Sequence, residues 1–230
     1  MEITKITKDI FFKLEKSLIE QGKDSDNRSF KEIKELLNNP PILGASEFAG
    51  EIIYAILTSG FKQKTAKKIH EKIMFYVNNT KDEIKIDDLL NIFRHQGKIE
   101  SICKIWNNKR SLQKEYYGLK TQEDRLIFLE KISYIGCITK YHHARNLGEN
   151  CYKPDIHIQR LATVLCDGDV NKINNAKLNK EVKILCDKMF CELEKEIGEK
   201  IGYIDVVLWK SCSENLLIPD LDRKKIILKI

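Results

Sequence analysis

The stretch from Ser133 to Ala162 reads SYIGCITKYHHARNLGENCYKPDIHIQRLA, and two breaks interrupt its helical pattern. The first break falls at Tyr134-Ile135-Gly136, between an apolar helix and a new helix predicted to start near Ile138. The second falls at Lys153-Pro154-Asp155, because proline disfavours helix at the residue before it and fits a helix entry. Asp155 is therefore predicted to be the N-cap of the next helix.

Each break has two interpretations. Gly136 can adopt backbone angles that other residues avoid, and it allows another molecule to approach the chain closely. Amides at the start of the following helix have no intrahelical partner, so the first break is suited to bind a phosphate. A plain helix–helix corner is the alternative. At the second break, the alternative is that the carboxylate of Asp155 does nothing except cap its helix.

The rest of the chain is predicted to be almost entirely helical. The segment from Phe48 to Leu57 is strongly apolar, which is typical of a central helix. The segment from Lys98 to Tyr117 is predicted to be one long helix, and residues 225–230 are predicted to be either a small strand or a frayed end. No alternation of period two extends over several strands, so the fold class is all-α, with about ten helices.

Composition sets further limits on the class of protein. The chain has 230 residues and a net charge of +6, a mild preference for a polyanionic partner. No apolar run is long enough to span a membrane, and charges throughout the first residues predict no signal peptide. The 7 cysteines form no CxxC pair, which favours free thiols in a reducing compartment.

Three segments together resemble a known family. In order, they are Ser133-Tyr134-Ile135-Gly136, Ala144-Arg145-Asn146-Leu147-Gly148 and Asp155-Ile156-His157-Ile158-Gln159-Arg160. They are similar to the hairpin, the end of the second helix and the catalytic aspartate motif of the helix-hairpin-helix (HhH-GPD) DNA glycosylases, the endonuclease III-like superfamily. Residues 47–60 and 202–209 resemble the family's central and C-terminal helices. Ser133 and Tyr134 depart from the family, which has proline and glycine there.

The resemblance implies two helical halves with an active-site cleft between them. The six-helix half would span residues 41–149 and contain the helix-hairpin-helix at about 122–148. The other half would combine residues 1–40 with residues 150–230 and carry Asp155. The implied activity is base-excision repair: Asp155 stabilises an oxocarbenium-like sugar and activates water, which releases a flipped damaged or mismatched base.

A single position decides the expected chemistry. Bifunctional members of the family carry a lysine two residues after the last glycine of the hairpin, and that position is Ile138 in this chain. Lys140 lies two residues further on, about 200° around the helix, and is expected to face away toward solvent or a DNA phosphate. We therefore expect a monofunctional glycosylase. The alternatives are a bifunctional glycosylase and AP lyase using Lys140, and a non-catalytic DNA-binding module of the same fold.

The resemblance also implies roles for neighbouring residues. His157 and Lys153 are expected to support the site. Phosphate binding is assigned to Gly136, Ile138, Thr139 and Lys140, and a structural monovalent cation to the carbonyls of Glu130, Ile132 and Ile135. No cofactor is expected to be required, and without a C-terminal four-cysteine cluster no iron–sulfur cluster is expected. The expected partner is double-stranded DNA with a lesion or mismatch, bound by a monomer without membrane contact, in the cytoplasm or at a prokaryotic nucleoid.

Overall fold

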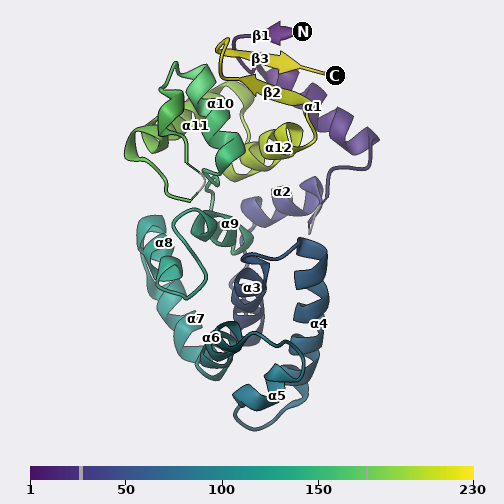
Figure 1. Cartoon of the computed structure of the whole chain (residues 1–230), viewed down its shortest axis with the longest axis vertical. Helices are drawn as coiled ribbons and strands as arrows, with labels where there is room; N and C mark the ends of the chain where they lie inside the picture. Colours follow the sequence, from purple (N-terminus) through teal and green to yellow (C-terminus); the bar gives the residue numbers. More distant parts are fainter. Residues whose placement is uncertain (26–27, 175) are drawn as a thin grey trace. The chain divides into compact units, whose positions relative to one another are not determined.

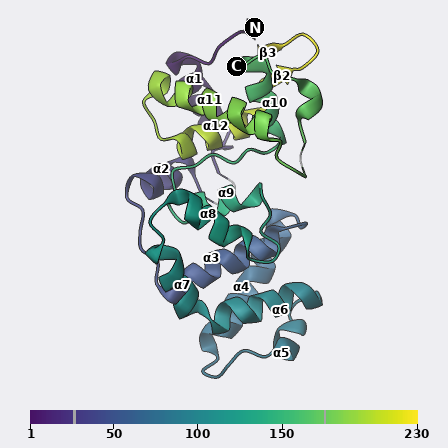
Figure 2. The same cartoon turned by 90° about the vertical axis from the view of Figure 1, so that its left-hand side faces the viewer.

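The computed structural model describes residues 1–25, 28–174 and 176–230. The chain divides into two compact units: residues 41–147 form one, and residues 1–40 with 148–230 form the other (Figures 1 and 2). The sequence prediction had placed the corresponding boundary at residue 149 instead of 147. Each unit has its own buried residues and is described separately below.

The unit of residues 41–147 is helical. Its elements are α3 (Ala45–Thr58), α4 (Gln63–Asn79), α5 (Ile86–Leu90), α6 (Gln96–Asn107), α7 (Lys109–Gly118), α8 (Gln122–Glu130) and α9 (Thr139–Asn146). Helix α3 is buried on nearly every face and packs against α4, α6, α7 and α9 (Figure 1). This confirms the prediction of a central helix, because a helix that is apolar all round must be covered all round.

The predicted single helix from Lys98 to Tyr117 is wrong. The structure has two helices there, α6 and α7, and the chain turns between them at Asn108. The side chain of Asn107 accepts a hydrogen bond from the amide of Ile84 and donates one to its carbonyl, each at 3.1 Å. These bonds fix the end of α6 against a distant loop, which a periodic pattern along the helix does not show.

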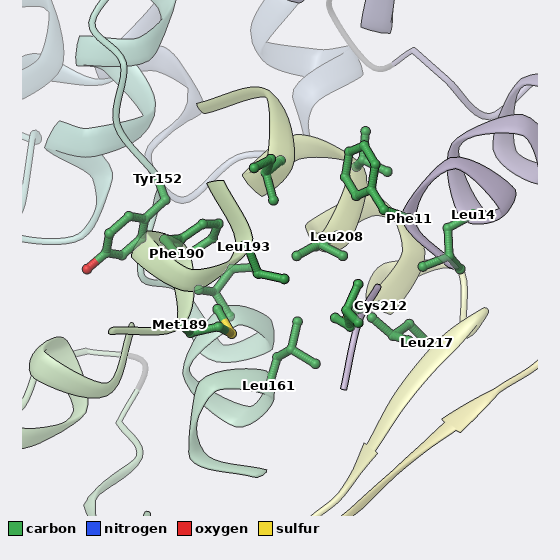
Figure 3. Packing of buried hydrophobic residues seen from close by; sticks show 14 of the residues in the cluster. Phe11, Leu14, Tyr152, Leu161, Met189, Phe190, Leu193, Leu208, Cys212 and Leu217 are labelled. Carbon is green, nitrogen blue, oxygen red and sulfur yellow. The ribbon is translucent and has the colours of Figure 1, made fainter. Parts of the chain in front are cut away.

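The second unit holds the other helices and a small sheet. Its helices are α1 (Lys8–Glu20), α2 (Phe30–Asn38), α10 (Ile156–Leu165), α11 (Lys180–Ile197) and α12 (Ile201–Ser213), with a 3₁₀ turn, η1, at Val170–Lys172. Figure 3 shows how their apolar side chains interlock, with Phe11 and Leu14 of α1 opposite Leu208 and Cys212 of α12. The core of this unit therefore joins residues from both ends of the chain.

The sheet is the part of the fold that the sequence did not predict. Strands β1 (Glu2–Ile3), β3 (Lys225–Leu228) and β2 (Leu217–Asp220) pair antiparallel in the order β1-β3-β2. The open question about residues 225–230 is thus resolved in favour of a strand over 225–228. Pro219 lies in β2, at the edge of the sheet, where a missing N–H is tolerated.

The rest of the fold is helical, as predicted. In the described part of the chain, no helix combines the length and the apolarity needed to cross a bilayer. All seven cysteines carry free thiols.

Candidate functional site

The hairpin joins α8 to α9 through residues 131–138. The amide of Ile135 donates to the carbonyl of Ile132 at 3.0 Å, which closes the turn. The amide of Lys140 donates to the carbonyl of Gly136 at 3.0 Å, and the amide of Gly136 donates to Oγ1 of Thr139 at 2.8 Å. The side chain of Thr139 therefore fixes the start of α9 to the hairpin, and the helix–hairpin–helix is present in three dimensions.

Tyr134 has an unusual backbone for its residue type. Its φ is 72°, in the left-handed region that favours glycine. Its ring meets the ring of His95 edge to face at 5.9 Å between centroids. Its hydroxyl occupies the space beside Gly97, where a β-carbon would lie 2.3 Å from the oxygen. Position 134 thus has a backbone geometry typical of glycine although it holds a tyrosine, and packing of the tyrosine ring against the start of α6 compensates for the strain.

The amides expected to bind a phosphate differ in their availability. The amide of Gly136 is already satisfied by Thr139. Among the described residues, the amides of Ile138 and Thr139 donate no hydrogen bond. These two are unsatisfied donors of the first turn of α9, so they are the groups with which the hairpin could hold an anion.

Lys140 does not face solvent. Its ammonium lies 2.6 Å from Oε2 of Glu130, and its side chain is 10% exposed. The lysine therefore fastens α9 to the end of α8. To bind a phosphate or act as a nucleophile, it would have to leave this ion pair. Ile138 is buried.

The expected cation ligands are the carbonyls of the same turn. Ile132 already accepts from Ile135, but a carbonyl oxygen has a second lone pair. In the described residues no donor reaches the carbonyls of Glu130 and Ile135. Three neutral oxygens on one tight turn are a donor set that suits a hard cation, so the residues fit the group.

Asp155 is the N-cap of α10, and its two carboxylate oxygens have different environments. Oδ1 accepts from the amides of His157 and Ile158, at 3.0 and 3.3 Å. Oδ2 lies 3.5 Å from the ammonium of Lys153. The aspartate is 6% exposed. Burial, followed by the negative charge of Asp155, raises the pKa of the Cys212 thiol to about 12, so that thiol is neutral beside the carboxylate.

His157 and Lys153 both lie next to Asp155. His157 is half-buried, and its backbone amide contributes to the cap. Lys153 contributes through its backbone as well as its side chain, because its amide donates to Oδ2 of Asp205 at 3.1 Å.

The segment from Gly148 to Asp155 is held by residues that the sequence analysis missed. The side chain of Asn150 accepts from the amide of Gly202 at 3.0 Å. The ring of Tyr152 stacks on Phe190 at 4.3 Å (Figure 3), and its hydroxyl donates to Asp187 at 2.5 Å. A carboxylate in the apolar sequence GYIDVVLW was a signal for Asp205, which is 1% exposed. These contacts fix the loop that presents Asp155.

A further residue that the sequence did not reveal, Lys98, lies near the hairpin. Lys98 is buried, and its ammonium donates to the carbonyls of Leu57, at 3.3 Å, and of Ser59. The ring of Phe61 covers it at 4.5 Å, and the ring of Tyr134 lies at 5.6 Å. Burial lowers the pKa of this lysine. Lys98 therefore caps the end of α3 and connects it to the hairpin through Tyr134.

Two helices joined by a tight hairpin, α8 and α9, are thus followed by α10, which a buried aspartate caps. The solved structures that this chain resembles are 8-oxoguanine DNA glycosylases. The enzyme of Methanocaldococcus jannaschii bound to a 15mer DNA containing 8-oxoguanine has a TM-score of 0.63 and 19% identity, over 90% of this chain and 98% of that one.

Two further solved structures have a similar fold. The M. jannaschii enzyme in a second crystal structure has a TM-score of 0.61 at 19% identity, over 87% of this chain and 92% of that chain. The 8-oxoguanine DNA glycosylase of Thermotoga maritima has a TM-score of 0.59 at 19% identity, over 87% and 94%. No protein-family model and no curated protein sequence matches the chain. At this identity, the likeness establishes the fold.

Proposed function

We propose that the protein is a DNA glycosylase of base-excision repair that hydrolyses the N-glycosidic bond of a damaged or mismatched base. The observation that carries the proposal is the environment of Asp155: a buried carboxylate with one oxygen in the helix cap and the other beside a single ammonium. The chain has the fold of 8-oxoguanine DNA glycosylases. Because those neighbours are named for 8-oxoguanine, that base is the first lesion to test.

In the proposed mechanism, the ionised Asp155 stabilises the positive charge that develops on the sugar as the base departs, and it orients or deprotonates the attacking water. The base has to leave the stack before the carboxylate can reach its sugar.

The same geometry supports base removal without strand cleavage. A lyase step needs a free amine to form a Schiff base with the sugar. Ile138 has none, and the amine of Lys140 is engaged with Glu130. The proposal is therefore a monofunctional enzyme, in which water is the nucleophile.

The hairpin would bind the DNA backbone through the amides of Ile138 and Thr139. A monovalent cation held by the carbonyls of Glu130, Ile132 and Ile135 would add positive charge to this turn when bound. The proposed partner is lesion-containing double-stranded DNA, bound by a monomer that works where the chromosome is, in the cytoplasm or nucleoid.

The test is a panel of duplexes that carry 8-oxoguanine, uracil, hypoxanthine, alkylated purine or thymine opposite guanine, each treated with alkali after incubation. The expected result is alkali-dependent cleavage for at least one lesion, reduced about 100-fold in Asp155→Asn. Asp169→Asn is the matched control, since Asp169 also caps a helical turn with its side chain. Asparagine preserves both caps but removes the charge.

Other outcomes would select the alternatives. Cleavage without alkali, with a covalent adduct trapped by borohydride, would show a lyase and overturn the monofunctional assignment. Full activity in Asp155→Asn would overturn the mechanism. Duplex binding without release of any base in the panel would leave a DNA-binding module of this fold.

A further inference from the structure

The N-terminal part of α4 carries a row of exposed lysines that neither the hairpin nor Asp155 accounts for. The opposite face of the helix is buried through Ala66, Ile73 and Val77. The exposed lysines of α4 and of its N-cap are called the lysine face below, and they are Lys62, Lys64, Lys67, Lys68 and Lys72.

The charges of the lysine face are not neutralised within the protein. Across the part of the chain that the structure describes, none of the five makes an ion pair or side-chain hydrogen bond. The only acidic residue of α4 is Glu71. Lysines elsewhere do have carboxylate partners, for example Lys172 with Glu181 and Lys225 with Glu2.

This arrangement is unfavourable for the helix itself. The N-terminal end of a helix carries a partial positive charge, so cations there are destabilising and acidic residues are preferred. The first turn of α4 has no acidic residue, a property it shares with α6, α7, α9, α10 and α12, and it contains Lys64 directly after the N-cap residue Lys62 and Gln63. Lys64, Lys68 and Lys72 also repeat at intervals of four residues, which places like charges next to one another. Glu71, four residues after Lys67 and three after Lys68, is the one acidic residue of α4 placed to offset this repulsion. Folding therefore does not explain why five lysines gather on this face.

We infer that the lysine face of α4 binds the phosphate backbone of duplex DNA, as a contact surface additional to the hairpin. The inference rests on the proposed function for the choice of DNA as the polyanion. From Lys64 to Lys72 the helix rises about 12 Å, which corresponds to three or four phosphates of one strand at ~3.4 Å each along the axis. Such contacts neutralise phosphates and release counterions, which favours binding irrespective of base sequence.

The experiment compares two fourfold variants that lose the same charge. One replaces Lys64, Lys67, Lys68 and Lys72 by glutamine, which has nearly the same helix propensity. The control replaces four exposed lysines on other helices and loops, and these are Lys5, Lys31, Lys188 and Lys195. Affinity for an undamaged duplex is measured by fluorescence anisotropy over a range of salt concentrations.

The expected result is a loss of salt dependence that is specific to α4. If all four lysines contact phosphates, the slope of log K against log salt becomes shallower by about 3 to 4 in the α4 variant. In the control variant it changes by less than one. The melting temperature of the α4 variant stays the same or rises, because repulsion within the helix is removed.

Three results would overturn the inference: equal slopes in the α4 variant and the wild type, equal changes in both fourfold variants, or no binding of duplex by the wild type. An α4-dependent loss of binding to RNA or to anionic vesicles, with duplex binding intact, would assign the lysine face to another partner. Failure of the proposed function looks different. In that case duplex binding would depend on α4, but no base in the lesion panel would be released.

Discussion

The contact between Tyr134 and Gly97 can be tested at the level of one oxygen atom. A β-carbon at Gly97 would lie 2.3 Å from the hydroxyl oxygen of Tyr134, whereas the next atom of the ring, Cζ, is 3.6 Å away. Gly97→Ala should therefore collide with the hydroxyl group and with nothing else. In the variant Tyr134→Phe, the same alanine would be in ordinary van der Waals contact.

The effect of Gly97→Ala on the free energy of unfolding should change sign between the wild type and Tyr134→Phe. Overpacking costs about 1–3 kcal/mol, and alanine in place of a helical glycine stabilises by ~0.5–1 kcal/mol. The ring of Tyr134 is 36% exposed and can shift outward, so the low end of the first range applies. Taking ~1 kcal/mol for overpacking and ~0.5 kcal/mol for the gain of alanine over glycine, we expect Gly97→Ala to destabilise the wild type by about 0.5 kcal/mol and to stabilise Tyr134→Phe by about 0.5 kcal/mol.

The assay is urea denaturation followed by tryptophan fluorescence. The chain has 2 tryptophans, and Trp106 belongs to α6 with Gly97, so a Trp209→Phe background makes the signal specific to this unit. Gly118→Ala is the control, because its β-carbon would meet nothing within 4 Å, and its effect should not depend on Tyr134. If Gly97→Ala destabilised both backgrounds equally, the hydroxyl would not be the obstacle, and the described packing of the hairpin on α6 would be wrong.

Three further predictions concern the site and its surroundings. Asp205→Leu removes the acceptor for the amide of Lys153, so hydrogen exchange of that amide should accelerate about 10-fold. Base release should fall while DNA affinity stays unchanged. Asp205→Asn retains an acceptor and should preserve both the slow exchange and the rate of base release. Glu130→Gln leaves the largely buried ammonium of Lys140 without its anion and should cost about 1 kcal/mol in denaturation, whereas Lys140→Met should leave base release unchanged. Burial raises the pKa of Cys212 from 9.0 to about 12, so its stabilising contribution is complete below pH 9 and is lost as the pH approaches 12; the unfolding free energy should fall more steeply across that range in the wild type than in Cys212→Ala.

The sequence predicted the features that depend on neighbouring residues. Pro154 and Asp155 mark a helix start through their own conformational preferences, and the structure has the cap at that residue. The orientation of Lys140 shows where such reasoning ends. The helical period predicts that Lys140 and Ile138 point in different directions, but it does not show that Lys140 forms an ion pair with Glu130 of the preceding helix.

Features that join distant parts of the chain were not predictable in this way. Asp205 binds the amide of a residue 52 positions earlier, and β1 pairs with β3 across almost the whole sequence. Tyr134 belongs to the same class. A tyrosine argues against a left-handed turn, and only the absence of a side chain at Gly97 makes room for its hydroxyl group. Such pairs can be recognised only when both residues are known to be neighbours in the fold, because each residue alone is ordinary in the sequence.

For Asp155, the structural and the functional interpretation are compatible because the carboxylate has two oxygens. Capping engages Oδ1 through two backbone amides, and any neutral acceptor at that position would serve as well. Capping does not explain why a charged group is buried there with Lys153 beside Oδ2. Burial of an ion pair is weak evidence for stability, because desolvation offsets most of the attraction. The fold therefore does not explain the negative charge of Asp155, which lies on a loop held by Asn150, Tyr152 and Asp205. A reaction with a cationic transition state would explain it, because such a transition state is stabilised by a nearby fixed anion.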